Sequence, residues 1–482
     1  MTGHATPDRT ATGATAGDAL PLSGVQEEMW TAYRSAPGSH AYNAVWRLRI
    51  RGTVDVPALE KAVAALQERH EQLRSLFVER DGLPRRVLLD RPHARLEVRD
   101  LPDADEATLY EASRRETHEP FRLETEGPLR VVLFRRSAQD AVLVPTAHHI
   151  VSDYVSRSMM VGDLLRAYAD FTAGRVPEWA PVTGSYAEYA EEEARYLASP
   201  AGRATADRWR SALAGSAPAE LPLDRPRPVL RALRGATVVR HLPADVVDAL
   251  PDAARAARTT PYAYALAAFQ AFVHRWTGQD DFLLGVPASN RMGRRLRDVV
   301  GCFLNTVPVR ARFTPGTTFR GAAAEAGREV TRCLVDGRYP GARLKAPTAG
   351  GRAPLFHMAV FLVPLDRMKL PVPPVPQGAP EGPPATCAGL RVSLVDDLAQ
   401  QEGQLDLLLR LEQAPDGITA VFSYDTDVFD RASIEGFADG FTRMLRAAVT
   451  EPARQVADVP LADEHDPAGL PGLGGAGEGP AF

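Results

Sequence analysis

The feature that most constrains the fold is a short apolar segment that ends in two histidines. Residues 141–145 read Ala-Val-Leu-Val-Pro, and His148, His149 and Asp153 follow closely. The apolar run predicts a buried strand, and residues 155–171 predict an amphipathic helix after it. The histidines therefore lie where a strand ends and a helix begins, which is a common position for catalytic groups.

The two histidines differ in what they can do. Adjacent side chains on an extended segment point to opposite sides, so only one ring can face a substrate. We assign that place to His149, because a neutral imidazole is well suited to accept a proton near pH 7. His148 is then expected to brace the backbone, and Asp153 to fix the loop by pairing with an arginine. A chance histidine pair in a strand-to-helix turn is the alternative at this point.

Composition excludes several classes of function. Of the 482 residues, 45% are hydrophobic and 24% are charged, which is ordinary for a globular chain. The net charge of −5 gives no argument for nucleic-acid binding. No apolar run is long enough to span a membrane, and residues 1–18 lack the apolar core that a signal peptide has, so we expect a cytoplasmic protein. Cys302, Cys333 and Cys387 are far apart and form no CxxC, which predicts buried thiols rather than metal ligands or disulfides.

The order of the expected elements divides the chain into two halves of mixed helix and strand. This makes it an α/β protein with mixed sheets. We expect one lobe over residues 19–180 and a second over residues 181–462, with a hinge near residues 172–222. The Gly-, Ala- and Pro-rich ends, residues 1–18 and 463–482, are expected to be disordered tails.

Local helix and strand signals occur in both halves. Ser23, with Gln26 three residues later, predicts a capping box at the start of a helix. Residues 129–135 are expected to pair with the apolar segment as a hairpin that delivers the histidines. In the second half, Thr260 and Pro261 predict the start of a helix that runs to residue 276.

Eight short stretches, taken together, point to a particular class of enzyme. They are Leu22–Trp30 (close to SxAQxRLW), Arg69–Phe77 (RHExLRTxF), His148–Asp153 (HHxxxD, followed by Tyr154), Tyr186–Ala190 (YxDYA), Gly285–Arg291 (GTPxxxR), Val300–Thr306 (IGxFVNT), Arg352–Phe356 (RxPLF) and Tyr424–Asp430 (YxTDLFD). In this order they resemble the condensation domains of non-ribosomal peptide synthetases. The resemblance covers essentially the whole expected fold.

This resemblance implies both a fold and an activity. The fold would be two lobes, each similar to chloramphenicol acetyltransferase, arranged in a V shape with the active site in a tunnel between them. The activity would be acyl transfer from a carrier-protein-bound thioester to an amine or alcohol. A carrier protein would supply the phosphopantetheine arm, and no intrinsic cofactor or metal is expected. Because no adenylation, carrier or thioesterase pattern accompanies the motifs, we expect a monomeric stand-alone enzyme or an excised domain.

The resemblance also implies roles for site residues. His149 and His148 are the candidate catalytic pair, with His149 facing the tunnel as general base or positioning group and His148 as structural brace. Asp153 is expected to form an ion pair with Arg291 across the junction of the lobes.

Three further residues are expected near the tunnel. Tyr154 stands where the family motif has glycine, and it either narrows the tunnel or packs away from it. Ser152 is a possible helix cap. Asn305 is expected either on the loop that floors the tunnel or in core packing with side-chain capping.

Other functions remain open from the sequence alone. A condensation-like docking protein without activity is one, and a CoA-dependent acyltransferase of the same superfamily is another. An epimerisation domain shares the HHxxxDG motif, although the 301–306 and 352–356 segments fit condensation better. Heterocyclisation is disfavoured because its DxxxxD replacement is absent.

Overall fold

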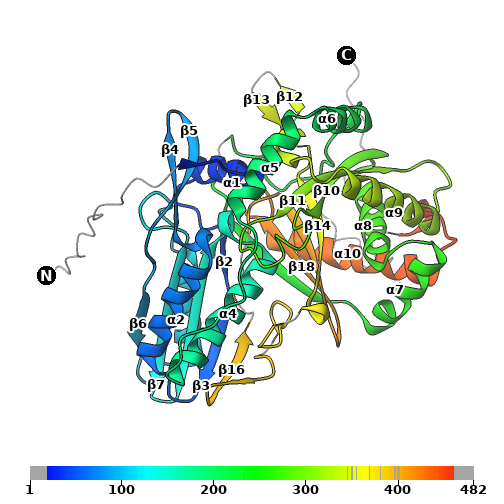
Figure 1. Ribbon diagram of the computed structural model, residues 1–482. Helices are drawn as coiled ribbons and strands as arrows, with labels where there is room; N and C mark the ends of the chain where they lie inside the picture. Colours follow the sequence, from blue (N-terminus) through cyan, green and yellow to red (C-terminus); the bar gives the residue numbers. More distant parts are fainter. Residues whose placement is uncertain are drawn as a thin grey trace, which may run out of the picture.

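The computed structural model describes residues 19–460, apart from 230, 345, 349–350, 354, 369, 380, 396–397 and 399–401. The two expected tails, residues 1–18 and 463–482, lie outside these residues. Pro354 of the RxPLF stretch does so as well, and the side chains of residues 346–348 and 351–353 are not described. Figure 1 shows the two halves of the chain side by side.

The first half forms a sheet that is covered by helices on both faces. Its helices are α1 (Gly24–Ser35), α2 (Val56–Arg69), α3 (Glu106–His118) and α4 (Tyr154–Thr172), with short 3₁₀ turns η1 (Glu71–Arg74) and η2 (His149–Val151). Its strands are β1 (Ala19–Leu20), β2 (Asn43–Val45), β3 (Arg47–Arg51), β4 (Ser75–Arg80), β5 (Leu83–Leu88), β6 (Leu96–Asp100), β7 (Leu129–Ser137) and β8 (Asp140–His148). Helices α2 and α4 share one apolar core with the sheet, and α3 packs on the other face. Strands β1, β5 and β4 form a small separate sheet.

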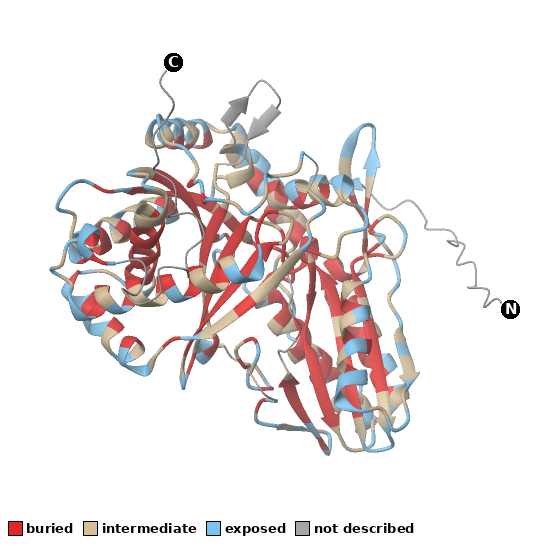
Figure 2. Ribbon diagram, turned by 180° about the vertical axis from the view of Figure 1, so that it is seen from behind, coloured by how far each residue is buried: buried red, intermediate tan, exposed pale blue. Residues whose placement is uncertain are grey.

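The second half forms a six-stranded sheet with the order β11-β10-β14-β17-β18-β9. Its helices are α5 (Tyr186–Ala198), α6 (Pro200–Leu213), α7 (Ala244–Ala256), α8 (Pro261–Thr277), α9 (Phe319–Val335) and α10 (Arg431–Thr450), with 3₁₀ turns η3 (Gly341–Leu344), η4 (Leu365–Arg367) and η5 (Val456–Asp458). Its strands are β9 (Gly235–His241), β10 (Asp281–Ser289), β11 (Leu304–Arg312), β12 (Ala346–Thr348), β13 (Gly351–Ala353), β14 (Met358–Pro364), β15 (Ala385–Cys387), β16 (Leu390–Val395), β17 (Leu407–Ala414) and β18 (Gly417–Asp425). Figure 2 shows that buried residues follow the central strands of both sheets.

The capping signals in the sequence explain where the principal helices begin. The Ser23 hydroxyl accepts from the backbone N–H of Gln26, whose side chain accepts from the Ser23 N–H, so the expected capping box is confirmed. The Thr260 hydroxyl accepts from the Ala263 N–H and so caps α8, and Pro261 is the first residue of this helix, as expected. Helix α8 ends at Gly278, whose φ of 72° is a left-handed conformation that favours glycine.

A strand pair from the second half completes the sheet of the first. Strand β16 pairs antiparallel with β3, with Leu394 opposite Leu48, and β15 pairs with β16. Residues 385–395, which follow strand β14 of the second half in the sequence, therefore lie in the sheet of the first half. The physical reason is that Leu390 and Val392, together with Leu394, alternate toward the core of the first half and are buried there.

The two large sheets share one pattern of strands. In the first, β6 is parallel to β7, β7 is antiparallel to β8, and β8 is antiparallel to β3. In the second, β14 is parallel to β17, β17 is antiparallel to β18, and β18 is antiparallel to β9. The hairpin strand β8 leads into α4, and β18 leads into α10, so the chain repeats one strand–turn–helix frame. Among the helices of residues 19–460, none is long and apolar enough to cross a bilayer.

Candidate active site

The two histidines lie at the end of β8, in the interior of the first sheet. The His148 backbone N–H donates to the Pro128 carbonyl at 2.9 Å, and the His149 N–H donates to the Tyr42 carbonyl at 2.7 Å. The two rings have different neighbours: aromatic rings of the first half surround His148, and the sulfur of Cys302 lies beside His149.

His148 is held in a closed box of aromatic rings. The rings of Tyr33, Tyr42 and Phe121 have centroids 5.9–6.2 Å from that of His148. Its Nδ1 accepts a hydrogen bond from the Ile150 N–H at 3.1 Å and so shapes the turn after the strand. Burial, together with the neighbouring His149 and Arg130, lowers the pKa of His148 to about 3. These contacts are those of a brace for the backbone.

His149 has its own enclosed surroundings. The residue is only 6% exposed, and its Nδ1 lies 3.6 Å from the sulfur of Cys302. Burial lowers the pKa of His149 to about 4, and the charge of Arg157 acts in the same direction, while the Asp153 carboxylate and nearby carbonyl oxygens oppose them. The ring is therefore neutral at pH 7 and has a nitrogen lone pair for a proton.

Asp153 joins the two halves of the chain beside these histidines. The carboxylate accepts from the Ser156 N–H at 2.7 Å and so caps α4. The Arg291 guanidinium donates to both carboxylate oxygens, at 3.0 and 3.1 Å, and the two side chains are 8–9% exposed. The expected ion pair is thus present and almost fully buried. Arg291 also stacks over the ring of Phe303, with its guanidinium carbon 4.3 Å from the ring centroid.

Tyr154, the residue in the glycine position of the motif, packs its ring within the first half. The ring lies edge-on to Trp46, with centroids 5.9 Å apart. The guanidinium carbon of Arg157 lies 5.0 Å from the Tyr154 ring centroid. Trp46 and Arg157 also line a small cavity of about 20 Å³ together with Ala147 and Met160. Of the two orientations expected for Tyr154, these contacts correspond to packing.

Ser152 and Asn305 differ in how far they fit their expected places. Helix α4 begins at Tyr154 and Asp153 caps it, so the expectation that Ser152 is the cap is wrong. The Ser152 hydroxyl is buried without a hydrogen-bond partner among the described residues. The Asn305 side chain makes three hydrogen bonds of 2.8 Å to backbone groups of the loop 337–341, which corresponds to the capping role among its two expected roles.

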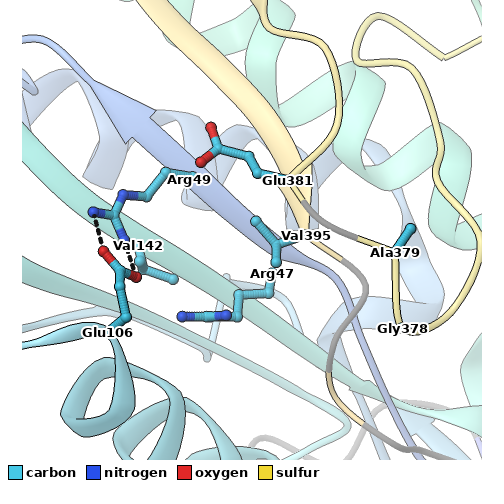
Figure 3. Close-up of a pocket in the computed structure, with 8 residues that line it drawn as sticks. All are labelled: Arg47, Arg49, Glu106, Val142, Gly378, Ala379, Glu381 and Val395. Atoms are coloured by element: carbon cyan, nitrogen blue, oxygen red, sulfur yellow. Dashed lines mark hydrogen bonds and ion pairs between the residues drawn. The ribbon is translucent and has the colours of Figure 1, made fainter.

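A larger cavity, of about 450 Å³, lies on the other face of the first sheet. Arg49 and Val142 are register partners on that face, and Figure 3 shows Arg49 paired with Glu106. Arg51 is likewise paired with Glu381 at the edge of this cavity. His149 is not among the residues that line this cavity, so the cavity is separate from the candidate active site.

Three residues that contact or act on His149 or Asp153 were not singled out as site residues from the sequence. Ser156 and Arg157 lie within one helical turn of Asp153, so the i+3 and i+4 spacing was an available signal. Cys302 is distant in sequence and no local pattern indicates the contact. All three cysteines are free thiols, but the expectation that all are buried is wrong for Cys387, which is partly exposed.

Comparison with known proteins gives matches along nearly the whole chain. Residues 16–470 match the family described as Condensation domain. One component of the linear gramicidin synthase of Brevibacillus parabrevis is 30% identical over 92% of this chain, and the match covers 8% of that protein. The chain spans less than a tenth of the length of the first curated relatives that it matches.

Solved structures match in both halves. The X-domain from teicoplanin biosynthesis is 26% identical with a TM-score of 0.81, covering 93% of this chain and 99% of that one. SgcC5 from Streptomyces globisporus, solved with (R)-(-)-1-(2-naphthyl)-1,2-ethanediol and sucrose, is 26% identical with a TM-score of 0.73, covering 90% of this chain and 100% of that one. The mixed α/β fold expected from the sequence is confirmed by these structures.

Proposed function

This chain belongs to the condensation-domain family, and we propose that it transfers an acyl or aminoacyl group from a carrier-protein thioester to an amine or an alcohol. The observation that supports this most is the His149 ring, which is buried, neutral at pH 7 and next to the clamp between Asp153 and Arg291. Condensation domains work with carrier-protein domains. In this proposal the carrier's phosphopantetheine arm brings the thioester to His149.

The proposed reaction forms one bond and breaks another. The nucleophile's nitrogen or oxygen attacks the thioester carbonyl carbon, and the carbon–sulfur bond breaks as the tetrahedral intermediate collapses. His149 accepts the proton that the nucleophile loses and passes it to the departing thiolate. The ring returns to its neutral form, and the step needs no oxidant or reductant.

The lowered pKa of His149 limits how it can act. A ring with a pKa of about 4 holds a proton poorly, so we expect the proton to pass through His149 without resting there. An α-amine has a pKa near 8 and is partly neutral at pH 7, whereas an alcohol must lose its proton during the attack. Loss of His149 should therefore slow ester formation more than amide formation.

A reconstitution experiment tests the proposal. Purified protein is incubated with a loaded carrier and either an amine or an alcohol, and product is measured by mass spectrometry. We expect product with the wild type and a loss of roughly 10²–10⁴-fold in His149→Ala. His93→Ala, a change on an exposed loop, is the matched control and should leave the rate unchanged. Equal rates in His149→Ala and the wild type would refute the role of His149.

A docking role is the second candidate function. The X-domain from teicoplanin biosynthesis, 25% identical to this chain in a structure of its complex with OxyB, supports it. The tyrosine at position 154, where the active-site motif has glycine, also favours this candidate. Absence of product from every loaded carrier and from CoA thioesters, together with tight binding of a partner protein, would support docking over acyl transfer.

A further inference from the structure

We propose that Cys302 is a positioning residue for His149. The segment 301–303, clamped by side chains from both halves, holds the Cys302 sulfur against Nδ1 of His149 and leaves Nε2 to exchange the proton. The kinetic part of this inference rests on the proposed function. Its structural part concerns the tautomer and orientation of one ring, and it can be measured without any activity.

The contact itself lies in a closed environment. The Cys302 sulfur is 3.6 Å from Nδ1, and both residues are buried. Burial raises the pKa of the Cys302 thiol well above its ordinary value, and the Asp153 carboxylate raises it further. The thiol therefore stays protonated and does not act as a nucleophile. The thiol can thus act only through its contact with the His149 ring.

The groups around Nδ1 decide which nitrogen of His149 carries the hydrogen. The backbone carbonyls of His149 and Ser152 raise the pKa of His149 and so oppose the effect of burial. A residue's own carbonyl reaches Nδ1 and not Nε2, because Nε2 lies at the far end of the ring. In this proposal Nδ1 carries the hydrogen, because a carbonyl oxygen can only accept, and the Cys302 sulfur 3.6 Å away is a further, weaker acceptor beside it. The lone pair of the neutral ring is then on Nε2.

Hydrogen bonds from the start of α4 hold the segment next to His149. The Ser156 hydroxyl donates to the Gly301 carbonyl at 2.6 Å and accepts from the Gly301 N–H at 3.1 Å. The Phe303 N–H donates to the Asp153 carboxylate at 3.1 Å. The residues on each side of Cys302 are thus tied to the same turn that carries His149. The backbone of Cys302 cannot move away from the turn that carries His149 without breaking these bonds.

Tyr186 fixes Cys302 from the opposite side. Its buried hydroxyl donates to the Cys302 carbonyl at 2.6 Å and also contacts the Ser23 hydroxyl at 2.8 Å. A Cβ on Gly301 would overlap the Tyr186 ring, so only glycine permits this close approach. Gly301 therefore allows the Tyr186 ring to come close enough for its hydroxyl to hold the Cys302 carbonyl.

Kinetics of substitutions at Cys302 test the inference. In Cys302→Ala the His149 ring loses its neighbour and can rotate, so we expect kcat to fall about tenfold or more while KM stays within about twofold. Cys302→Ser keeps an acceptor of similar size and should stay within about threefold of the wild-type kcat. Cys333→Ala is the matched control: its thiol is also buried, but it lies in the core of the second half and should leave kcat unchanged.

A spectroscopic measurement separates this inference from the proposed function. In protein labelled with ¹⁵N-histidine, the His149 signals are assigned by their loss in His149→Ala. We expect the Nδ1–H tautomer in the wild type and in Cys302→Ser, and mixed tautomers in Cys302→Ala. An unchanged spectrum and an unchanged kcat in Cys302→Ala would overturn the inference. The inference would also be overturned if kcat fell equally in Cys302→Ser and Cys302→Ala and the decrease matched the loss of thermal stability in each variant. A wild type that makes no product would refute the function, while the tautomer would still decide the positioning role.

Discussion

The hairpin of the first half and the hairpin of the second lead into helices by the same route but end in different environments. Strand β8 ends at His148 and helix α4 is capped by Asp153; strand β18 ends at Asp425 and helix α10 is preceded, at the same interval, by Asp430. Asp153 is nearly buried and binds Arg291 from the other half. The Asp430 side chain is 64% exposed and binds Arg225 at 2.7 Å within its own half.

This difference shows that the strand–turn–helix fold is shared by both halves, whereas the candidate catalytic residues occur only in the first. Both turns place an aspartate before a long helix, but only the first turn carries histidines, and only there does the aspartate side chain accept from the helix backbone. The first turn also receives a segment from the other half, through Phe303 and Gly301, whereas the second does not use its aspartate in this way. Of the two strand–turn–helix segments, the candidate active site is thus the one that a segment from the opposite half contacts.

The largest expected effect distinguishes the two aspartates by stability. Asp153→Ala leaves the buried Arg291 without its carboxylate, so we expect a loss of about 3–5 kcal/mol in the free energy of unfolding. Asp430→Ala breaks an exposed pair and should cost about 0–1 kcal/mol. Urea denaturation of both variants measures this, and Asp153→Asn keeps the cap acceptor as a control. Equal losses for the two alanine variants would show that burial across the halves does not matter.

The next prediction uses the pH dependence of stability. Burial holds the pKa of His148 near 3 and that of His149 near 4, below the ordinary value of 6.5, so the unfolded chain binds more protons between these values. The free energy of unfolding should therefore fall as pH drops from 6.5 toward 4, by about 1.4 kcal/mol per pH unit for each histidine.

Replacing one histidine isolates its share of this dependence. His148→Gln should reduce the slope by about 1.4 kcal/mol per pH unit between pH 6 and pH 4.5, measured by urea denaturation at several pH values. His93→Gln, on an exposed loop, is the control for the substitution. The same slope in His148→Gln and the wild type would mean that His148 is not buried as a neutral ring.

The sequence was sufficient where the signal is local. The capping box of Ser23 and Gln26, the Thr260–Pro261 start of α8 and the hairpin that carries the histidines follow from residues within one turn or strand of each other. The pairing of Asp153 with Arg291 was expected only through the family resemblance, because no local pattern links two residues so far apart in sequence.

The features that were missed depend on tertiary contacts. The alternation of Leu390 and Val392 fits a strand, but nothing near them shows that it joins the sheet of the first half. The prediction that Ser152 caps α4 was wrong because the cap is the residue just before the helix. The sequence predicts that boundary only to within a residue or two. The approach of Cys302 to His149 is set by bonds from both halves, which no sequence window contains.

The smallest expected effect concerns the first residue of each helix, Tyr154 in α4 and Arg431 in α10. The Tyr154 ring contacts Trp46 and Arg157, so Tyr154→Phe, which keeps the ring, should change the free energy of unfolding by less than about 0.5 kcal/mol. Tyr154→Leu keeps apolar volume but loses the contact between the ring and the guanidinium, at a cost of about 0.5–1 kcal/mol.

Product formation in the same variants shows whether Tyr154 only packs against its neighbours or takes part in the reaction. If the ring only packs, Tyr154→Phe and Tyr154→Leu should both keep the rate of product formation within about threefold of the wild type, because both keep a large apolar side chain against Trp46. A rate that collapses in Tyr154→Phe while stability is unchanged would place the hydroxyl in the reaction. The first turn would then differ from the second by three chemical groups, the two histidines and this hydroxyl.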